Sequence, residues 1–348
     1  MKNTRTWLII SLSISIIAIV LVIGFTATEG IFDSLAKIRI EYLLVAVGLR
    51  ILAWLAFANR LRVMSNLLGG HLTLPQSTKI ILCSVFVAGI TPSYLGGGPL
   101  RIYMLKNKGL SVGDATAVDI GGRALDGLVL AALFPFAWFI LGDAVSANVT
   151  LSWILIAIGV ALCIGLGIGL YGLIRPELTK RILVHLAQYR IINKVTFGQI
   201  QPIVNRINLE IDDFRSGLLV FVREGRTVLP IALLSTTAYW LCLFAIGPVI
   251  LLGLNTDPIW FLAMAAQLVL MLLASIPLAP GGSGIAELSA ISLYSRLLPT
   301  TSLETIGVFV VIWRCLTYYA NLLVGGIASL NTLRNVESDN MAQEEESG

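Results

Sequence analysis

The sequence is poor in the residues that metal centres and disulfide frameworks use. It contains 2 histidines and 4 cysteines, and no cysteine lies close in sequence to another. Metal sites and disulfide frameworks usually show closely spaced cysteine and histidine residues. The sequence therefore predicts no metal site, no cofactor and no disulfide framework. The residues concerned are His71, His185, Cys83, Cys163, Cys242 and Cys315.

Charge is also scarce. Charged residues make up 13% of the 348 residues, and hydrophobic residues make up 57%. Soluble domains carry about 25% charged residues. Apolar runs near the roughly 20 residues that cross a bilayer recur along the chain, which predicts an all-α, multi-spanning membrane protein. The clearest runs are residues 7–25, 42–58, 128–141, 151–174, 228–254, 259–276 and 305–330.

The distribution of positive charge predicts an orientation. Most of the 24 Lys and Arg residues fall in segments that one topology places on one side: the N-terminus, 60–79, 101–108, 175–226 and Arg334. Only Lys37, Arg39 and Arg296 fall on the other side. Because positive residues are retained in the cytoplasm, we expect a cell-membrane protein with both termini cytoplasmic. The first run is expected to be an uncleaved span rather than a signal peptide.

This orientation requires the run 79–92 to enter the membrane and return to the same side. The run is too short to cross, and it ends in Pro92-Ser-Tyr-Leu-Gly-Gly-Gly-Pro99, which a continuous helix would not hold. Irregular backbone at membrane depth is tolerated only where protein or a wet cavity covers it. We therefore expect a broken, re-entrant hairpin.

The glycine-rich break occurs twice. Pro92 precedes Gly96-Gly97 by four residues, and Pro277 precedes Gly281-Gly282 by four. In each half a serine then precedes an intramembrane arginine by twelve residues: Ser111 before Arg123, and Ser302 before Arg314. The matched spacing predicts an inverted repeat, with copies at about 42–141 and 228–330, as in many secondary transporters. The fold expected is about six full spans plus two re-entrant broken hairpins.

These elements are expected to form one membrane domain over residues 1–334. The segment 175–226 is expected to be a cytoplasmic loop, either with amphipathic helices on the membrane surface or as a solvated linker. The acidic segment 335–348 is expected to be disordered.

A few ionisable residues lie within apolar segments, where charge is costly and usually faces a partner or a wet cavity. Arg123 and Asp126 share one helix face, as a local ion pair or as part of a site. Arg314 has no acid within a turn, so Glu287 or an anionic ligand is the expected partner. Arg50 could either serve a site or extend its charge to an interface.

Each break is also expected to end in a helix N-terminus, with Pro99 opening the first helix and Ser283 or Gly284 capping the second. Such N-termini, next to arginines, suit a phosphate-bearing ligand. The sequence therefore predicts a substrate-binding site and no catalytic residue. The predicted site residues are Gly96, Gly97, Gly98, Arg101, Arg123, Asp126, Gly281, Gly282, Ser283, Gly284, Glu287 and Arg314.

The first break through Arg101, the Arg123-Ala-Leu-Asp126 element and Pro280-Gly-Gly-Ser-Gly-Ile-Ala-Glu287 together resemble the lysylphosphatidylglycerol synthase transmembrane-region family, also described as flippase-like. The resemblance covers about residues 6–333. Many members carry a glutamate where this chain has Gly98, so the role of that acid does not transfer. No aminoacyl-transferase domain follows the last span, so we do not expect an enzyme that aminoacylates lipid.

The resemblance implies movement of a lipid between leaflets, with an anionic phospholipid or a polyprenyl-phosphate-linked lipid as cargo. Two alternatives remain open from the sequence: an inverted-repeat transporter of small solutes, and the membrane subunit of an enzyme acting on lipid-linked sugar. Expected partners are membrane lipids and, in the last case, a separate glycosyltransferase or synthase; no nucleic acid partner is expected.

Overall fold

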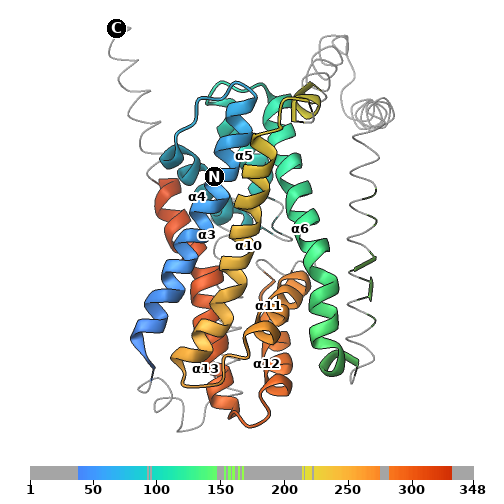
Figure 1. Cartoon of the computed structure of the whole chain (residues 1–348). Helices are drawn as coiled ribbons and strands as arrows, with labels where there is room; N and C mark the ends of the chain where they lie inside the picture. The colour runs from blue at the N-terminus through green and yellow to red at the C-terminus, as the bar shows by residue number, and fades with distance from the viewer. Residues whose placement is uncertain are drawn as a thin grey trace, which may run out of the picture.

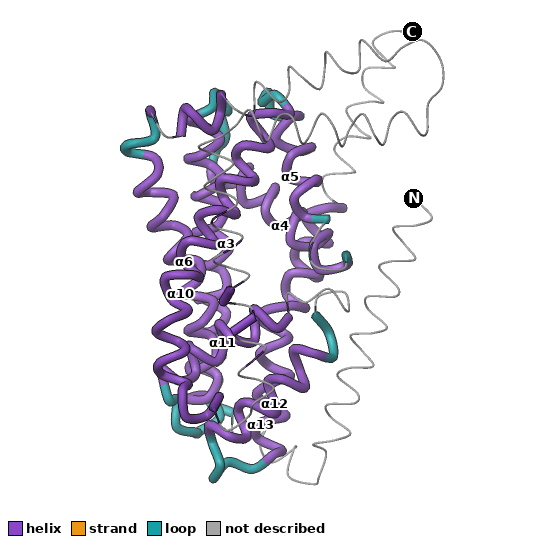
Figure 2. The backbone as a smooth tube through the Cα atoms, turned by 90° about the vertical axis from the view of Figure 1, so that its right-hand side faces the viewer, coloured by secondary structure: helices purple, strands orange, loops and turns teal. Residues whose placement is uncertain are grey.

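The computed structural model describes residues 38–91, 94, 96–146, 214, 216–221, 223–274 and 282–330, with a few helical residues between 153 and 167. Within these residues the chain is helical and contains no strand (Figure 2). The predicted first span at 7–25 and the predicted tail at 335–348 lie outside the described residues. Most of the predicted span at 151–174 and of the loop at 175–226 lies outside them as well.

Among the described residues, four helical stretches are long and apolar enough to cross a membrane. They are α3 (Ile40–Leu67), α6 (Val112–Ser146), α10 (Val228–Gly253) and a last stretch from Leu303 to Leu330. The last one consists of α13 (Leu303–Arg314), a π-helical turn η1 (Cys315–Tyr319) and a further α-helical part. A helix as long as α3 spans about 42 Å, more than the roughly 30 Å of the hydrocarbon core.

Two of these helices are longer than the sequence predicts. The apolar run at 42–58 extends through Arg60 to Leu67, and the run at 128–141 begins at Val112 rather than at residue 128. Both extensions contain charged residues, which ended the predicted runs. In the structure Arg60 and Asp119 are buried and Arg123 is half-exposed, and each of the three forms an ion pair, so they do not interrupt the helix.

Four shorter helices form two broken pairs. The first pair is α4 (Leu74–Ile90) and α5 (Gly97–Lys106), and the second is α11 (Trp260–Ala274) and α12 (Ile285–Leu297). With 17 and 15 residues, α4 and α11 extend only about 25 and 22 Å, too short to cross alone. The pair α4 and α5 lies at one end of the bundle, and α11 and α12 lie toward the other (Figure 1).

The described helices thus repeat one order: long, short, short, long. The first long helices of the two halves, α3 and α10, pack along one another and run antiparallel. The amide of Arg39 donates to the carbonyl of Gly253 at 2.9 Å, whereas the Phe57 and Tyr239 rings lie 5.1 Å apart. The residue numbers rise along α3 as they fall along α10.

The two serines with matched spacing begin the last long helix of each half. The Ser111 hydroxyl accepts from the amide of Asp114 at 3.0 Å, and the Ser302 hydroxyl accepts from the amide of Thr305 at 3.3 Å. Each satisfies an amide that the first helical turn leaves without a partner. Arg123 and Arg314 therefore both lie about 18 Å along their helices from the N-cap.

The apolar side chains form a core at each end and an apolar outer surface. One core cluster includes Phe244 and Phe309 near α11 and α12, and another includes Met64 and Leu105 near α4 and α5. Phe139 is nevertheless 87% exposed, and many other large apolar residues point outward. Helices that are apolar all round are typical of membrane spans. Polar side chains are buried among these helices as well, including Arg50, Asp119, Gln267 and Arg314.

Candidate functional site

Both helix breaks have backbone that a continuous helix would not adopt. Tyr94 has φ of 55° in the first break, and Gly284 has φ of 87° at the N-cap of α12. The carboxylate of Glu287 accepts from the Gly284 amide at 2.6 Å, which satisfies one of the free amides of the helix start. The predicted cap at Gly284 is therefore confirmed.

The first of the two new helices begins earlier than predicted. α5 starts at Gly97 with Gly96 as N-cap, so Pro99 is its third residue and not its first. Proline is tolerated there because the first four amides of a helix have no partner within it. The start of α5 is consequently made by the glycine triplet itself.

A buried ion pair lies at the second break. Arg314 Nε donates to Glu287 Oε1 at 2.7 Å, and both side chains are almost fully buried. The predicted pairing of Arg314 with Glu287 is confirmed. A longer contact of 3.4 Å joins Arg314 to the hydroxyl of Ser283, so three of the predicted site residues meet at this point.

The first break has a related but more open arrangement. The carboxylate of Asp119 accepts from Arg101 at 2.6 Å and from Arg123 at 2.9 Å, so one acid serves two arginines. The Asp119 side chain is 7% exposed, whereas that of Arg123 is 51% exposed. Gly98 lies against this group, because a Cβ there would be 2.5 Å from an Arg123 nitrogen.

Asp126 does not pair with Arg123, so of the two interpretations given for these residues the local ion pair is wrong. Its carboxylate accepts two bonds from Arg60, at 2.5 and 3.0 Å, and a third from the indole of Trp240 at 3.0 Å. A bidentate contact suits the planar guanidinium and explains the choice of partner. Arg60, predicted in the cytoplasmic stretch 60–79, is instead buried in α3.

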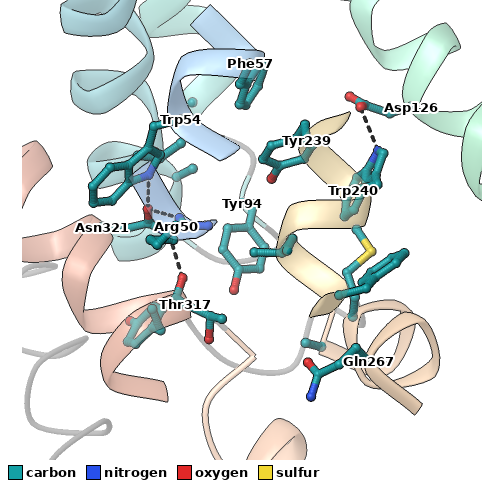
Figure 3. A pocket seen from close by; sticks show the side chains of 18 of the residues that line it. Arg50, Trp54, Phe57, Tyr94, Asp126, Tyr239, Trp240, Gln267, Thr317 and Asn321 are labelled. Carbon is teal, nitrogen blue, oxygen red and sulfur yellow. Dashed lines mark hydrogen bonds between the residues drawn. The ribbon is translucent and has the colours of Figure 1, made fainter. Parts of the chain in front are cut away.

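A cavity of about 400 Å³ lies between the two breaks, within the 300–1,000 Å³ range of small-molecule sites. Figure 3 shows Tyr94 of the first break between Arg50 and Asn321 on one side and Tyr239 and Trp240 on the other. The charged lining residues are Arg50, Arg101, Arg123, Arg314 and Asp126. The aromatic lining residues are Trp54, Phe57, Tyr94, Tyr239, Trp240, Phe244, Trp313 and Tyr318.

The cavity brings together much of the predicted site. Gly97, Arg101, Arg123, Asp126 and Arg314 line it. Gly98, Ser283 and Glu287 contact lining arginines, and Gly96, Gly282 and Gly284 belong to the breaks. Gly281 lies outside the described residues. Whether these residues bind a substrate stays a prediction.

The sequence analysis did not identify several residues that line or support the cavity. Asp119 could have been identified, because it precedes Arg123 by four residues and so shares its helix face. Thr317, Tyr318 and Asn321 follow Arg314 at spacings of three, four and seven, which also place them on one face. Arg60 and Arg50 could not be assigned from spacing, since their partners come from distant parts of the chain.

Within the described residues, no group of three or more His, Cys, Asp or Glu side chains could hold a metal ion. The cavity lining provides guanidinium groups, the Asp126 carboxylate, aromatic rings, amides and hydroxyls. Guanidinium groups bind phosphate and carboxylate, and aromatic rings supply apolar walls with polar edges. The arrangement suits an amphipathic ligand with an anionic group.

The helices and their polar interior define a multi-pass membrane protein of the broken-hairpin type. The chain belongs to the lysylphosphatidylglycerol synthase transmembrane-region family, whose model matches residues 8–325. This membership confirms the resemblance seen in the glycine breaks.

The relatives of this chain include UPF0104 membrane proteins of three species. A UPF0104 membrane protein of Archaeoglobus fulgidus is 30% identical over 319 residues, which cover 92% of this chain and 95% of the relative. UPF0104 membrane proteins of Methanothermobacter thermautotrophicus and Methanocaldococcus jannaschii are 26% and 25% identical. They cover 85% and 97% of this chain, and 86% and 98% of their own lengths. These matches extend over nearly the whole chain, so the similarity includes both halves.

Proposed function

We propose that this protein is a lipid translocase that moves an anionic phospholipid or a polyprenyl-phosphate-linked lipid between leaflets. The observation that carries the proposal is the arginine-lined cavity between two helix breaks, inside a bundle whose outer surface is apolar. An anionic headgroup crosses hydrocarbon at high cost unless polar groups replace its water. The cavity supplies such groups while the lipid tails remain in the bilayer.

The proposed architecture is an inverted repeat, with α3 to α6 as one copy and α10 to α13 as the other. The antiparallel packing of α3 on α10 and the positions of the short pairs toward opposite ends support it. In transporters of this plan, substrate sites lie where discontinuous helices meet, and one repeat moves against the other. The cavity would then open alternately toward each leaflet of the cell membrane.

We propose a transport role and not a catalytic one. The carboxylates at the cavity, Asp119, Asp126 and Glu287, all bond to arginines. A carboxylate held in this way is a poor general base, because the positive partner stabilises its charged form. Their role in the proposal is to hold the arginines in place.

The test is leaflet exchange in liposomes of phosphatidylcholine and phosphatidylglycerol. Tracer lipids should carry the fluorophore on an acyl chain, so that the headgroup keeps its natural size for the cavity. The protein is expected to speed exchange of the anionic tracer more than that of the zwitterionic tracer. Arg123→Gln should weaken this effect, and Arg39→Gln, at an exposed site outside the cavity, should not.

A folded, monodisperse protein that exchanges neither tracer would contradict transport of these phospholipids. The same liposomes loaded with a polyprenyl-phosphate sugar would then test the second cargo. Failure with both lipids, together with uptake of a water-soluble solute, would identify a solute transporter.

A further inference from the structure

Arg50 is the arginine of the cavity that no carboxylate among the described residues neutralises. Arg60, Arg101, Arg123 and Arg314 each pair with a carboxylate. Arg50 is 4% exposed, and within the described part of the chain its hydrogen-bond partner is the neutral side chain of Asn321. An intramembrane arginine normally faces a counter-charge or a wet cavity. Here it is the cavity that Arg50 faces.

Two buried donors of the cavity wall are also without an acceptor. Arg50 Nε and Trp313 Nε1 have no hydrogen-bond partner among the described residues, and both side chains line the cavity. Buried donors are almost always bonded in native proteins, so each exception requires an explanation, and beside a cavity an acceptor that enters the cavity can supply one. Both groups are donors, and what they require is an acceptor.

The guanidinium of Arg50 is nevertheless held in place. Its Nη2 donates to Asn321 Oδ1, and the same oxygen accepts from the indole of Trp54 at 3.0 Å. The guanidinium carbon also lies 4.9 Å from the centre of the Trp54 ring. Arg50 is thus held by neutral partners, and its positive charge is not balanced by them.

Arg50 lies between the two breaks. It is about 15 Å from the start of α3 and about 25 Å from its end. Phe57, whose ring contacts Arg101, lies about 10 Å further along the same helix. Asn321 in turn lies about 10 Å beyond Arg314 on its own helix. Arg101 and Arg314 mark the two breaks, so Arg50 is at an intermediate depth.

We propose that Arg50 is the anion-binding subsite of the cavity and that it takes the phosphate of a lipid headgroup. The phosphate accepts hydrogen bonds from the Arg50 guanidinium, and the headgroup occupies the aromatic-lined space beside it. The inference deepens the proposed translocase function and rests on it for the source of the phosphate. Arg314 and Arg123, which bond to carboxylates, then position the cavity walls and do not carry the main share of anion binding.

The experiment measures thermal unfolding of the full chain in a neutral detergent, titrated with dioleoylphosphatidylglycerol, dioleoylphosphatidylcholine or inorganic phosphate. We expect phosphatidylglycerol to raise the midpoint of the wild type more than phosphatidylcholine does. In Arg50→Gln the apparent affinity for phosphatidylglycerol should fall about tenfold or more, because a charge-assisted hydrogen bond is lost. Arg50→Lys should retain part of it, and Arg39→Gln all of it.

A fold defect would not obscure this result. Arg50→Gln leaves none of the described carboxylates unpaired, so without lipid its midpoint should equal or exceed that of the wild type. An equal response of the wild type to both lipids, or an unchanged anionic response in Arg50→Gln, would overturn the proposal. Inorganic phosphate could instead raise the unfolding midpoint of the wild type as much as phosphatidylglycerol does, and fail to raise that of Arg50→Gln. This result would support the phosphate subsite and assign it to a free anion.

The subsite and the translocase can fail separately. Lipid exchange that is equal in the wild type and in Arg50→Gln would support the translocase function and contradict the subsite. Selective binding of phosphatidylglycerol that depends on Arg50, without any lipid exchange, would support the subsite and contradict the translocase function.

Discussion

The guanidinium of Arg314 and the carboxylate of Glu287 meet at 2.7 Å in the protein interior, where their side chains are 4% and 2% exposed. The second oxygen of Glu287 accepts from the amide of Gly284. One carboxylate thus connects the last residue of α13 to the first turn of α12. This contact fixes the second break against the long helix.

Removal of either partner of this pair is therefore expected to destabilise the protein strongly. Glu287→Gln or Arg314→Gln leaves one buried charge without compensation, which costs about 3–5 kcal/mol. The double variant should lose less than the sum of the two single variants, because it buries no lone charge. The free energy of unfolding in detergent measures all three. Glu41→Gln breaks the exposed Arg39–Glu41 pair and should have no measurable effect; equal losses at both sites would contradict the argument.

The close approach at Gly98 gives a second prediction. A methyl group there would lie 2.5 Å from an Arg123 nitrogen and 2.9 Å from an Asp119 oxygen. Gly98→Ala should displace the end of Arg123, reduce exchange of anionic lipid and cost about 1–3 kcal/mol of stability. At Gly48, in the middle of α3, a methyl group would have no atom within 4 Å among the described residues. Gly48→Ala should stabilise by up to about 1 kcal/mol and leave exchange unchanged.

The opposite order of effects would show that Gly98 is not tightly packed. A normal exchange rate in Gly98→Ala, together with a normal free energy of unfolding, would indicate that Arg123 has room to move without consequence. Arg123 is half-exposed and lines the cavity. Its displacement should therefore change the rate of lipid exchange as well as the free energy of unfolding.

The helices were predictable from the sequence where apolar residues are continuous. α10 lies within one residue of the predicted run 228–254, because nothing charged interrupts it. The apolar runs that predicted α3 and α6 were too short, since charged residues such as Arg60 and Asp119 lie beyond them. Their compensation depends on tertiary contacts, which a local pattern does not contain.

The sequence predicted which residues belong to the site better than it predicted which of them bond to one another. The glycine breaks and the buried arginines identify the region, and the isolated position of Arg314 in its sequence correctly suggests Glu287. The bond from Asp126 to Arg60 spans 66 residues, and that from Arg50 to Asn321 spans 271. Such partners are set by helix packing, so sequence spacing offered only the local neighbour Arg123 as a partner for Asp126.

The corrected partner of Asp126 can be tested by double-mutant cycles. Arg60 and Asp126 are in direct contact, so their coupling energy is expected at about 0.5–3 kcal/mol. Asp126 bonds to Arg60 and Trp240 instead of Arg123, so the cycle of Arg123→Gln with Asp126→Asn should give a coupling near zero. The free energies of unfolding of the single and double variants provide both values. Coupling concentrated on Arg123 would show that the local pair forms after all.

The predicted orientation places the turn between α5 and α6 in the cytoplasm and the turn between α12 and α13 on the opposite side. Lys108 and Thr300 are exposed residues of these two turns, which lie at opposite ends of the bundle (Figure 1). In a background with the four native cysteines replaced by alanine, Thr300→Cys should react with a membrane-impermeant maleimide added to intact cells. Lys108→Cys should react only after the membrane is opened, because positive charge retains its turn in the cytoplasm. The reverse pattern would invert the topology, and reaction of both cysteines in intact cells would show that the two broken hairpins do not face opposite sides.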